Sequence, residues 1–380
     1  MIYGHSTGEI VRLDLFGGNQ QRPAGAAAPR PAAASGQRTS SAAGSVRTPD
    51  WLIPVVETEA QSETAVITVV DDPPAIALFT SPHRLQLFDT KGKKLGQGPD
   101  LAGVGRILRT APGWLAAATD RQIVLCDLRR NTMTRLDLSL VQVTHLAIKP
   151  DDFGLALVQE RDRIGRVTTA GRWVWKHELR FPIEDLAIGP QGFAAITTNG
   201  GQLQVFDPAG EFTIGFTVDP TDPPLLIEAP EGSPPGVTWV TLTRRAQWLR
   251  GHNLRGEVVW DRQVPWEGWS LVRLGRFAVI TSADGRSLAF DGSGAVHGQG
   301  SPAEDANSVF ATSAEGEILR IARHNVHLIG ATIDGRVRWR AVTEQPAGPM
   351  AAGPPGTAVM LGKSLAWFKN EFARPAKPGP

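Results

Sequence analysis

Five residues near the N-terminus carry the pattern of a serine-hydrolase nucleophile. Residues 4–8 read GHSTG and match G-x-S-x-G, a motif whose serine lies on a sharp turn between a buried strand and a helix. Here three residues precede the motif, and an alternating strand pattern follows it. The segment also aligns with residues 252–256, which contain no serine. We interpret it as a turn between strands.

Two histidines and three acidic doublets are the other side chains that could do chemistry. His324 and His327 are three residues apart, on opposite faces of a strand, so a shared metal ion would need a turn between them. The acidic doublets stand beside proline or glycine at strand entries, where solvated turn residues are common; they are residues 71–72, 151–152 and 304–305. We expect a histidine pair without metal, and acids without a general acid–base role.

Motifs for other kinds of site are absent from the sequence. The chain has no G-x-x-x-x-G-K-[ST] phosphate loop, no H-E-x-x-H zinc motif and no EF-hand calcium loop. Its single cysteine, Cys126, excludes an intramolecular disulfide, a cysteine-based zinc finger and a C-x-x-C redox centre. We therefore predict no catalytic residue, no bound cofactor and no metal.

The composition limits both the fold and the partners. The chain has 41 glycines and 29 prolines among 380 residues, and both residue types break helix interiors, which argues against long helices. Hydrophobic residues make up 41% of the chain, enough for a large core. The net charge of +1 creates no strong field that would attract nucleic acid or a membrane. No run of about 18 apolar residues and no signal-peptide pattern occurs, so we predict a cytoplasmic protein without a membrane span.

Residues 17–50 differ from the rest of the chain. Small or helix-breaking residues fill 22 of these 34 positions, and the segment has no aromatic residue. Such a segment buries too little apolar surface to offset its ordering entropy, so we predict a flexible linker. We interpret the segment mainly as a solvated linker. Its positively charged residues are weak candidates for contact with an acidic partner; they are Arg22, Arg30, Arg38 and Arg47.

From about residue 65 the chain repeats with a period of about 40 residues. Each unit contains four short apolar or alternating strand patterns, with a tight turn before the last. Glycine supplies the positive φ that such hairpin corners require. The turns fall at Gly92, Asn131, Gly171, Gly210, Gly256, Gly294 and Gly335. Short strands in units of this length predict an all-β fold, a single β-propeller of four-stranded blades.

The two ends of the chain are predicted to meet in one blade. The last unit, residues 350–370, has inner strands but no outermost strand. Residues 8–15 begin at Gly8 and match the outermost-strand pattern of residues 255–260. We predict that this N-terminal strand closes the ring, because propellers must hide their strand edges.

These patterns divide the chain into four parts. We assign residues 1–16 to the closing strand, 17–50 to the linker, 51–372 to the propeller and 373–380 to a disordered tail. Eight blades are favoured, and seven remain possible if the weak unit at residues 104–140 is miscounted.

Three units carry a tryptophan four residues after the turn glycine. They are Trp175, Trp260 and Trp339. This spacing resembles the repeat of PQQ-like (quinoprotein-type) propellers, a resemblance that covers roughly residues 65–370 and implies that each tryptophan packs against the next blade. The chain also resembles WD40 propellers, although its only Trp-Asp pair is at residues 260–261. A PQQ dehydrogenase is not expected, because such enzymes generally bind the quinone beside a vicinal cysteine pair.

Arginine outnumbers lysine by 31 to 8. Arginine is enriched at protein interfaces because its planar guanidinium pairs well and is weakly hydrated. Alanine and glycine are also abundant, however, so we attribute the excess to a GC-rich genome.

Three functional hypotheses follow from this fold. The first is a non-catalytic scaffold that binds one or more protein partners as a subunit of a larger assembly. The second is an enzyme or small-molecule binder that uses the central channel, which predicts acids and histidines at the channel mouth. The third is a likeness to the lipoprotein propellers of outer-membrane assembly, against which the missing signal peptide counts. Nucleic acid is not an expected partner.

Overall fold

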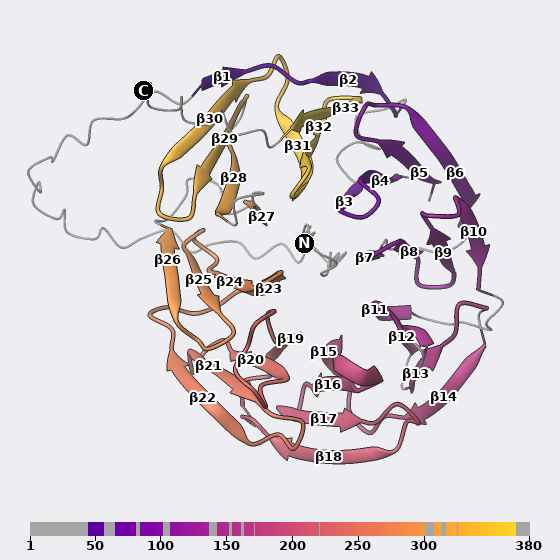
Figure 1. The fold of residues 1–380 in the computed structure, drawn as a ribbon, viewed down its shortest axis with the longest axis vertical. Helices are drawn as coiled ribbons and strands as arrows, with labels where there is room; N and C mark the ends of the chain where they lie inside the picture. The colour runs from indigo at the N-terminus through magenta and orange to yellow at the C-terminus, as the bar shows by residue number, and fades with distance from the viewer. Residues whose placement is uncertain are drawn as a thin grey trace, which may run out of the picture.

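The computed structural model describes twelve stretches of the chain. They are residues 45–56, 65–80, 84–101, 107–136, 143–151, 154–160, 163–170, 172–219, 221–300, 308–312, 317–324 and 326–369. These stretches form an all-β ring of eight sheets around a central channel (Figure 1). The propeller prediction with eight blades is therefore confirmed.

The first four blades follow one another along the chain. Blade one has β3 (Val66–Val70), β4 (Ala75–Thr80), β5 (Arg84–Asp89) and β6 (Lys94–Asp100). Blade two has β7 (Ile107–Ala111), β8 (Trp114–Ala118), β9 (Ile123–Asp127) and β10 (Thr132–Arg135). Blade three has β11 (Val143–Asp151), β12 (Gly154–Glu160), β13 (Arg163–Val167) and β14 (Trp173–Glu178). Blade four has β15 (Ile183–Ile188), the 3-10 turn η1 (Pro190–Gly192), β16 (Ala194–Thr198), β17 (Gln202–Phe206) and β18 (Phe212–Thr217).

The remaining blades complete the ring. Blade five has β19 (Leu225–Glu228), β20 (Trp239–Thr243), β21 (Trp248–His252) and β22 (Val258–Gln263). Blade six has β23 (Ser270–Leu274), β24 (Phe277–Thr281), β25 (Ser287–Asp291) and β26 (Val296–Gly300). Blade seven has β27 (Val309–Thr312), β28 (Ile318–His324), β29 (His327–Thr332) and β30 (Val337–Val342). Blade eight has β31 (Ala347–Gly353), β32 (Gly356–Leu361) and β33 (Ser364–Lys369).

In blades one to six the first strand lies nearest the channel and the last lies at the rim (Figure 1). Middle strands such as β4 are buried along their whole length, because neighbouring blades cover both faces of the sheet. Outer strands such as β18 alternate between exposed and partly buried residues. The core therefore lies between the blades: Phe79 and Leu85 of blade one share a cluster with Leu115 and Val124 of blade two.

The turns before the outer strands have the geometry that the sequence predicts. Gly92, Gly210, Gly256, Gly294 and Gly335 all have φ between 77° and 88°, a region that side chains rarely adopt. In blade two Asn131 takes this place with φ of 52°, which asparagine tolerates better than most residues. Gly8 and Gly171 lie outside the described residues.

The closing strand differs from the prediction. In blade eight, β33 pairs on one side with β32 and on the other with β2 (Trp51–Pro54). β2 therefore lies beside β33, in the outer position of this blade that the sequence analysis gave to residues 8–15; those residues lie outside the described part of the chain, so their own pairing stays a prediction. Residues 51–54 escaped the prediction because no turn glycine precedes them, unlike residues 8–15.

A further strand comes from the segment predicted as a linker. β1 (Ser45–Arg47) pairs in parallel with β30, so blade seven has five strands. Arg47, one of the candidate partner-binding arginines, donates from its guanidinium to the backbone oxygen of Lys369 in blade eight. The last residues of this segment thus lie along the rim of the last two blades (Figure 1).

The three tryptophans in the repeat lie at the seams between consecutive blades. Trp175 packs over Gly210 and stacks on Phe206, with ring centroids 5.8 Å apart. Trp260 lies over Gly294 and donates its indole N–H to the oxygen of Gly292 at 3.0 Å. Trp339 stacks on Phe368 at 5.8 Å.

Two further aromatic residues lie at seams between blades, but the sequence pattern did not predict them. Trp51 lies over Gly92 and donates to the oxygen of Thr90 at 2.9 Å, which joins blade eight to blade one. Phe216 packs against Gly256, six rather than four residues after its own turn glycine. A shift of two residues along a strand keeps the side chain on the same face, so the seam remains filled.

Candidate functional site

The central channel contains a cavity of about 440 Å³. Its walls come from the first strands of blades two to six, namely β7, β11, β15, β19 and β23. These strands have their inner edges toward the channel (Figure 1). The lining combines small and branched apolar residues with charged residues toward the strand ends.

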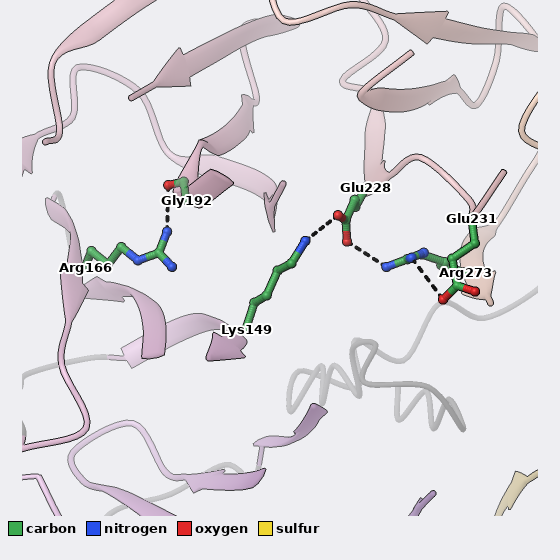
Figure 2. Close-up of polar contacts among 6 residues, drawn as sticks. All are labelled: Lys149, Arg166, Gly192, Glu228, Glu231 and Arg273. Atoms are coloured by element: carbon green, nitrogen blue, oxygen red, sulfur yellow. Dashed lines mark hydrogen bonds and ion pairs between the residues drawn. The ribbon is translucent and has the colours of Figure 1, made fainter. Parts of the chain in front are cut away.

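A chain of charged residues lies where these first strands end (Figure 2). The ammonium group of Lys149, at the end of β11, contacts a carboxylate oxygen of Glu228, at the end of β19. Nη1 of Arg273, on β23, lies 2.6 Å from the other oxygen of Glu228, and Nη2 lies 3.6 Å from Glu231. Lys149 therefore reaches from blade three past blade four to blade five, and the chain of charges continues to blade six.

Partial burial strengthens this cluster. The side chains of Lys149, Arg273 and Glu228 are 33%, 27% and 17% exposed, whereas Glu231 is 71% exposed. Charges shielded from water interact more strongly than charges at the surface. The two cations and Glu228 thus form the shielded part of the cluster, and Glu231 belongs to its solvated rim.

The opposite end of the cavity has a second ion pair and an aromatic ring. Nη2 of Arg244, in the turn between β20 and β21, lies 3.0 Å from Glu184, the second residue of β15. Trp269, just before β23, lines the same cavity and is 40% exposed. Between the two ends the wall is apolar, with Leu186, Ile227 and other aliphatic residues.

Two buried charged residues tie the inner strands to each other. Arg109 of β7 is 2% exposed and donates from Nε to the oxygen of Leu146 on β11 at 2.7 Å. Asp185 of β15 accepts from the backbone nitrogens of Leu186 and Leu226, both at 2.9 Å. Burial raises the pKa of Asp185 to about 6, and the two backbone hydrogen bonds oppose that rise. These contacts join neighbouring blades and are structural.

Arg166 makes a similar link further from the channel. It is fully buried in β13 and donates from Nη1 to the oxygen of Gly192 at 2.7 Å (Figure 2). Gly192 ends η1, so blade three is joined here to blade four. Several arginines that the sequence analysis attributed to genome composition therefore hold the ring together or line its channel.

The cavity lining contains acids and one histidine, His145, as the channel hypothesis predicts for the channel mouth. Glu184 and Glu228 are each paired with a cation, and the Asp185 carboxylate accepts two backbone N–H groups. In the described part of the chain, no group of three or more His, Cys, Asp or Glu side chains could hold a metal ion.

The candidates from the sequence fall elsewhere. His324 and His327 lie opposite each other across the β28–β29 hairpin. Asp72 lies in an exposed turn beside Arg129, with 2.7 Å between Oδ2 and Nη2. Cys126 is buried in β9, and burial raises the pKa of its thiol to about 12. Arg22, Arg30, Arg38, the GHSTG segment and the doublet at 304–305 lie outside the described residues.

The outer rim has a separate feature on blades four, five and six. The outer strands β18, β22 and β26 each begin with an exposed apolar residue two positions after the turn glycine. These residues are Phe212, Val258 and Val296, which are 57%, 51% and 59% exposed. The three strands follow one another along the rim in Figure 1. We call Phe212, Val258 and Val296 the apolar rim.

The comparisons with known proteins establish the fold. No protein-family model and no curated protein sequence matches the chain. The C-terminal WD40 domain of Sif2 superposes with a TM-score of 0.64 at 9% identity, covering 86% of this chain and 99% of that one. BamB from Moraxella catarrhalis superposes with a TM-score of 0.54 at 13% identity, covering 85% and 99%. BBS1N, solved in complex with ARL6DN, gives 0.51 at 13% identity, covering 87% and 99%.

The chain therefore has the β-propeller fold of WD40 and PQQ-like repeat proteins, as the repeat pattern predicts. In the described residues no helix is long and apolar enough to cross a membrane. The channel charges were missed in the sequence because Lys149, Glu228 and Arg273 are 79 and 45 residues apart. Only the repeat register, which places each at the end of a first strand, could have brought them together.

Proposed function

We propose that this chain is a non-catalytic scaffold, a subunit of a larger assembly, that binds a protein partner along the apolar rim of blades four to six. The observation that carries the proposal is the apolar rim itself. Phe212, Val258 and Val296 stand at equivalent places on three consecutive outer strands, each more than half exposed. An exposed apolar side chain repeated at the same place on consecutive blades offers a partner a row of apolar contacts.

The edges of the same strands favour an extended segment as the partner's contribution. In the described part of the chain, β18, β22 and β26 each pair along one edge. At blade seven the chain itself shows how such an edge is used, because β1 adds to β30 as a fifth, parallel strand. An extended peptide that adds to a sheet edge gains affinity from its main chain and specificity from its side chains.

The solved propellers of similar fold support a binding role. BBS1N was solved in complex with ARL6DN, so a propeller of this architecture serves there as a binding partner. A rigid ring with variable outer surfaces suits such a role, since function lies in sites added to a fold.

The test is a triple substitution on the apolar rim. Phe212→Asp, Val258→Asp and Val296→Asp together place three charges where we expect the partner to dock. Val342→Asp is the matched control, because Val342 is 59% exposed on β30, whose edge is already covered by β1. Tagged chains would be purified from the native organism at equal expression, and the bound protein would be quantified.

We expect a stoichiometric partner with the wild type and with Val342→Asp, and its loss with the triple variant. Recovery of the same partner by the triple variant would overturn the rim assignment. The absence of any stoichiometric partner from the wild type would overturn the scaffold proposal itself.

A further inference from the structure

The channel cavity is a second candidate binding site, and it lies inside the ring, away from the apolar rim (Figure 1). We propose that it binds a neutral small molecule that has an apolar body and a hydroxyl or amide group. Such a ligand is preferred there over an anion or a cation of the same size. This inference goes beyond the scaffold proposal and does not depend on it.

The charges that line the cavity balance one another. Among the described residues of the lining there are four cations and four carboxylates. An ion that enters gives up part of its hydration and finds no unmatched charge of the opposite sign in return. A neutral ligand does not meet this penalty. The charged residues are Arg109, Lys149, Arg244 and Arg273, with Glu184, Asp185, Glu228 and Glu231.

Each end of the cavity is also balanced by itself. At one end two cations, Lys149 and Arg273, face two carboxylates, Glu228 and Glu231 (Figure 2). At the other end one arginine lies 3.0 Å from one glutamate; they are Arg244 and Glu184. Neither end therefore favours one sign of charge in a ligand.

A hydroxyl or amide group suits an ion pair of this kind. Either group both donates and accepts hydrogen bonds, so it can contact a cation and a carboxylate together. The ion pair stays closed, because the ligand brings no charge that would replace either partner. The side chains of Arg244 and Glu184 are 33% and 17% exposed, and this partial shielding from water strengthens such hydrogen bonds.

The wall between the two ends supplies the apolar contacts. Ala147 of β11 and Leu225 of β19 line the cavity and are partly exposed. Trp269 adds an indole that is 40% exposed. An apolar body that lies along this wall is removed from water, which favours binding whatever the charge balance. The volume of about 440 Å³ lies within the usual range for small-molecule sites.

The test compares three six-carbon probes that differ in their charge. Hexan-1-ol, hexanoate and hexylammonium would be titrated into the full chain and followed by saturation-transfer NMR. The measurement is made at pH 8, where carboxylates are ionised and histidines are neutral. We expect hexan-1-ol to bind with a dissociation constant of about 1–5 mM, and both ions to bind at least about fivefold more weakly.

Two variants shift the charge balance in opposite directions. Glu228→Gln leaves one excess positive charge, so hexanoate should bind about tenfold more tightly than to the wild type. Lys149→Met leaves one excess negative charge, so hexylammonium should bind about fivefold more tightly. The affinity for hexan-1-ol should change less than about threefold in both. Glu211→Gln is the matched control, because Glu211 is exposed in the turn before β18 at the rim.

Two further variants keep the test available if Glu228→Gln does not fold. Glu231→Gln changes a side chain that is 71% exposed, and it should strengthen hexanoate binding about twofold. Ala147→Leu places a larger side chain on the apolar wall. It should weaken hexan-1-ol about fivefold without a change in charge, which locates the ligand in the cavity.

Three results would overturn the inference. They are either ion binding to the wild type as tightly as hexan-1-ol, hexanoate binding unchanged in folded Glu228→Gln and Glu231→Gln, and no saturation transfer to hexan-1-ol at about 20 mM. The rim variants leave the channel residues unchanged. A failure of the rim experiment therefore does not affect these measurements, and the two proposals fail separately.

Discussion

Two neighbouring seams are filled from opposite sides. Between blades five and six the earlier blade supplies the bulky side chain, and between blades six and seven the later blade supplies it. At the first, Trp260 of blade five lies over Gly294 of blade six, four residues after its own turn glycine. At the second, the equivalent position of blade six is Gly298. The side chain of Ile333, from blade seven, fills the space above it.

The difference shows what the repeat requires. At these two seams one bulky apolar side chain faces one glycine, and either blade can supply the side chain. Blade one resembles blade six, because Gly96 and Gly98 lie against Met133 of blade two. A search for tryptophan alone therefore misses the seams that isoleucine or methionine fills.

The largest effect is expected where the seam residue is most buried. Trp339 is 2% exposed and stacks on Phe368 of blade eight. Trp339→Ala should lower the free energy of unfolding by about 3–5 kcal/mol, because it leaves a large cavity between two blades. Equilibrium denaturation measures this loss, with the exposed Val342→Ala as control. A loss below about 1 kcal/mol would contradict the role of the seam.

The seam between blades four and five should respond to pH. His252 is 1% exposed, its ring centroid lies 5.4 Å from that of Phe216, and burial lowers its pKa to about 4. The unfolded chain binds this proton near pH 6.5 and the folded chain only near 4, so stability is complete above pH 6.5 and falls with acid. The loss is about 3 kcal/mol.

His252→Gln should remove this component, since glutamine does not titrate. Denaturation of both proteins between pH 7 and pH 4 gives the two slopes. Asp185 titrates in the opposite sense, with its contribution lost as the pH rises toward 6, and it is present in both proteins. Parallel pH profiles for the wild type and His252→Gln would sink the prediction.

A direct exchange of seam types should cost less. Gly298→Trp would bring the new side chain into Ile333, whose Cγ2 lies 2.3 Å from the place of a Cβ, and overpacking of this kind costs about 1–3 kcal/mol. Adding Ile333→Ala makes room for the new indole, so that the seam has the arrangement found at Trp260, with a tryptophan of the earlier blade. We expect the double variant to be more stable than the sum of the two single changes predicts, by about 1 kcal/mol or more. Simple additivity would show that the two seam types are not equivalent.

The smallest expected effect comes from substituting a turn glycine, and it separates the cost of the backbone conformation from the cost of seam packing. Gly294 and Gly335 have φ of 77° and 88°, but a Cβ at 294 would lie 2.9 Å from Trp260, whereas at 335 nothing lies within 4 Å. Gly335→Ala should cost about 1 kcal/mol, from backbone conformation alone. Gly294→Ala should cost about 1 kcal/mol more, because Trp260 must shift. Equal losses in the free energy of unfolding for the two variants would mean that the indole of Trp260 moves aside without cost, which would contradict this prediction.

The fold could be predicted from the sequence because its signal is local and repeated. The turn of Asp291 to Gly294 closes on itself: Asp291 accepts from the backbone nitrogens of Ser293 and Ala295, and Gly294 donates to the oxygen of Asp291. Every group in this turn lies within four residues, so the residue types are enough to identify it. The strand at Trp51–Pro54 was missed because it pairs with β33, more than 300 residues away, and has no local turn signal.

The candidate sites could not be predicted from the sequence in the same way. Phe212, Val258 and Val296 read in the sequence as ordinary strand residues, and their exposure follows from their place at the rim. Arg109 and Arg166 carry no signal in the sequence, yet both are buried and donate to backbone oxygens of the next blade. The sequence does not indicate which distant backbone carbonyl a charged side chain will contact.

By itself, then, the sequence determined the repeating unit and its turns and favoured eight units over seven, because these features depend on backbone conformation and on contacts a few residues apart. Tertiary structure alone decided which strand closes the ring, which residue fills each seam and which charges face the channel. Lys149, Glu228 and Arg273 come from three blades and become neighbours only when the ring closes (Figure 2). The physical reason is that ring closure sets those distances, and no local propensity encodes it.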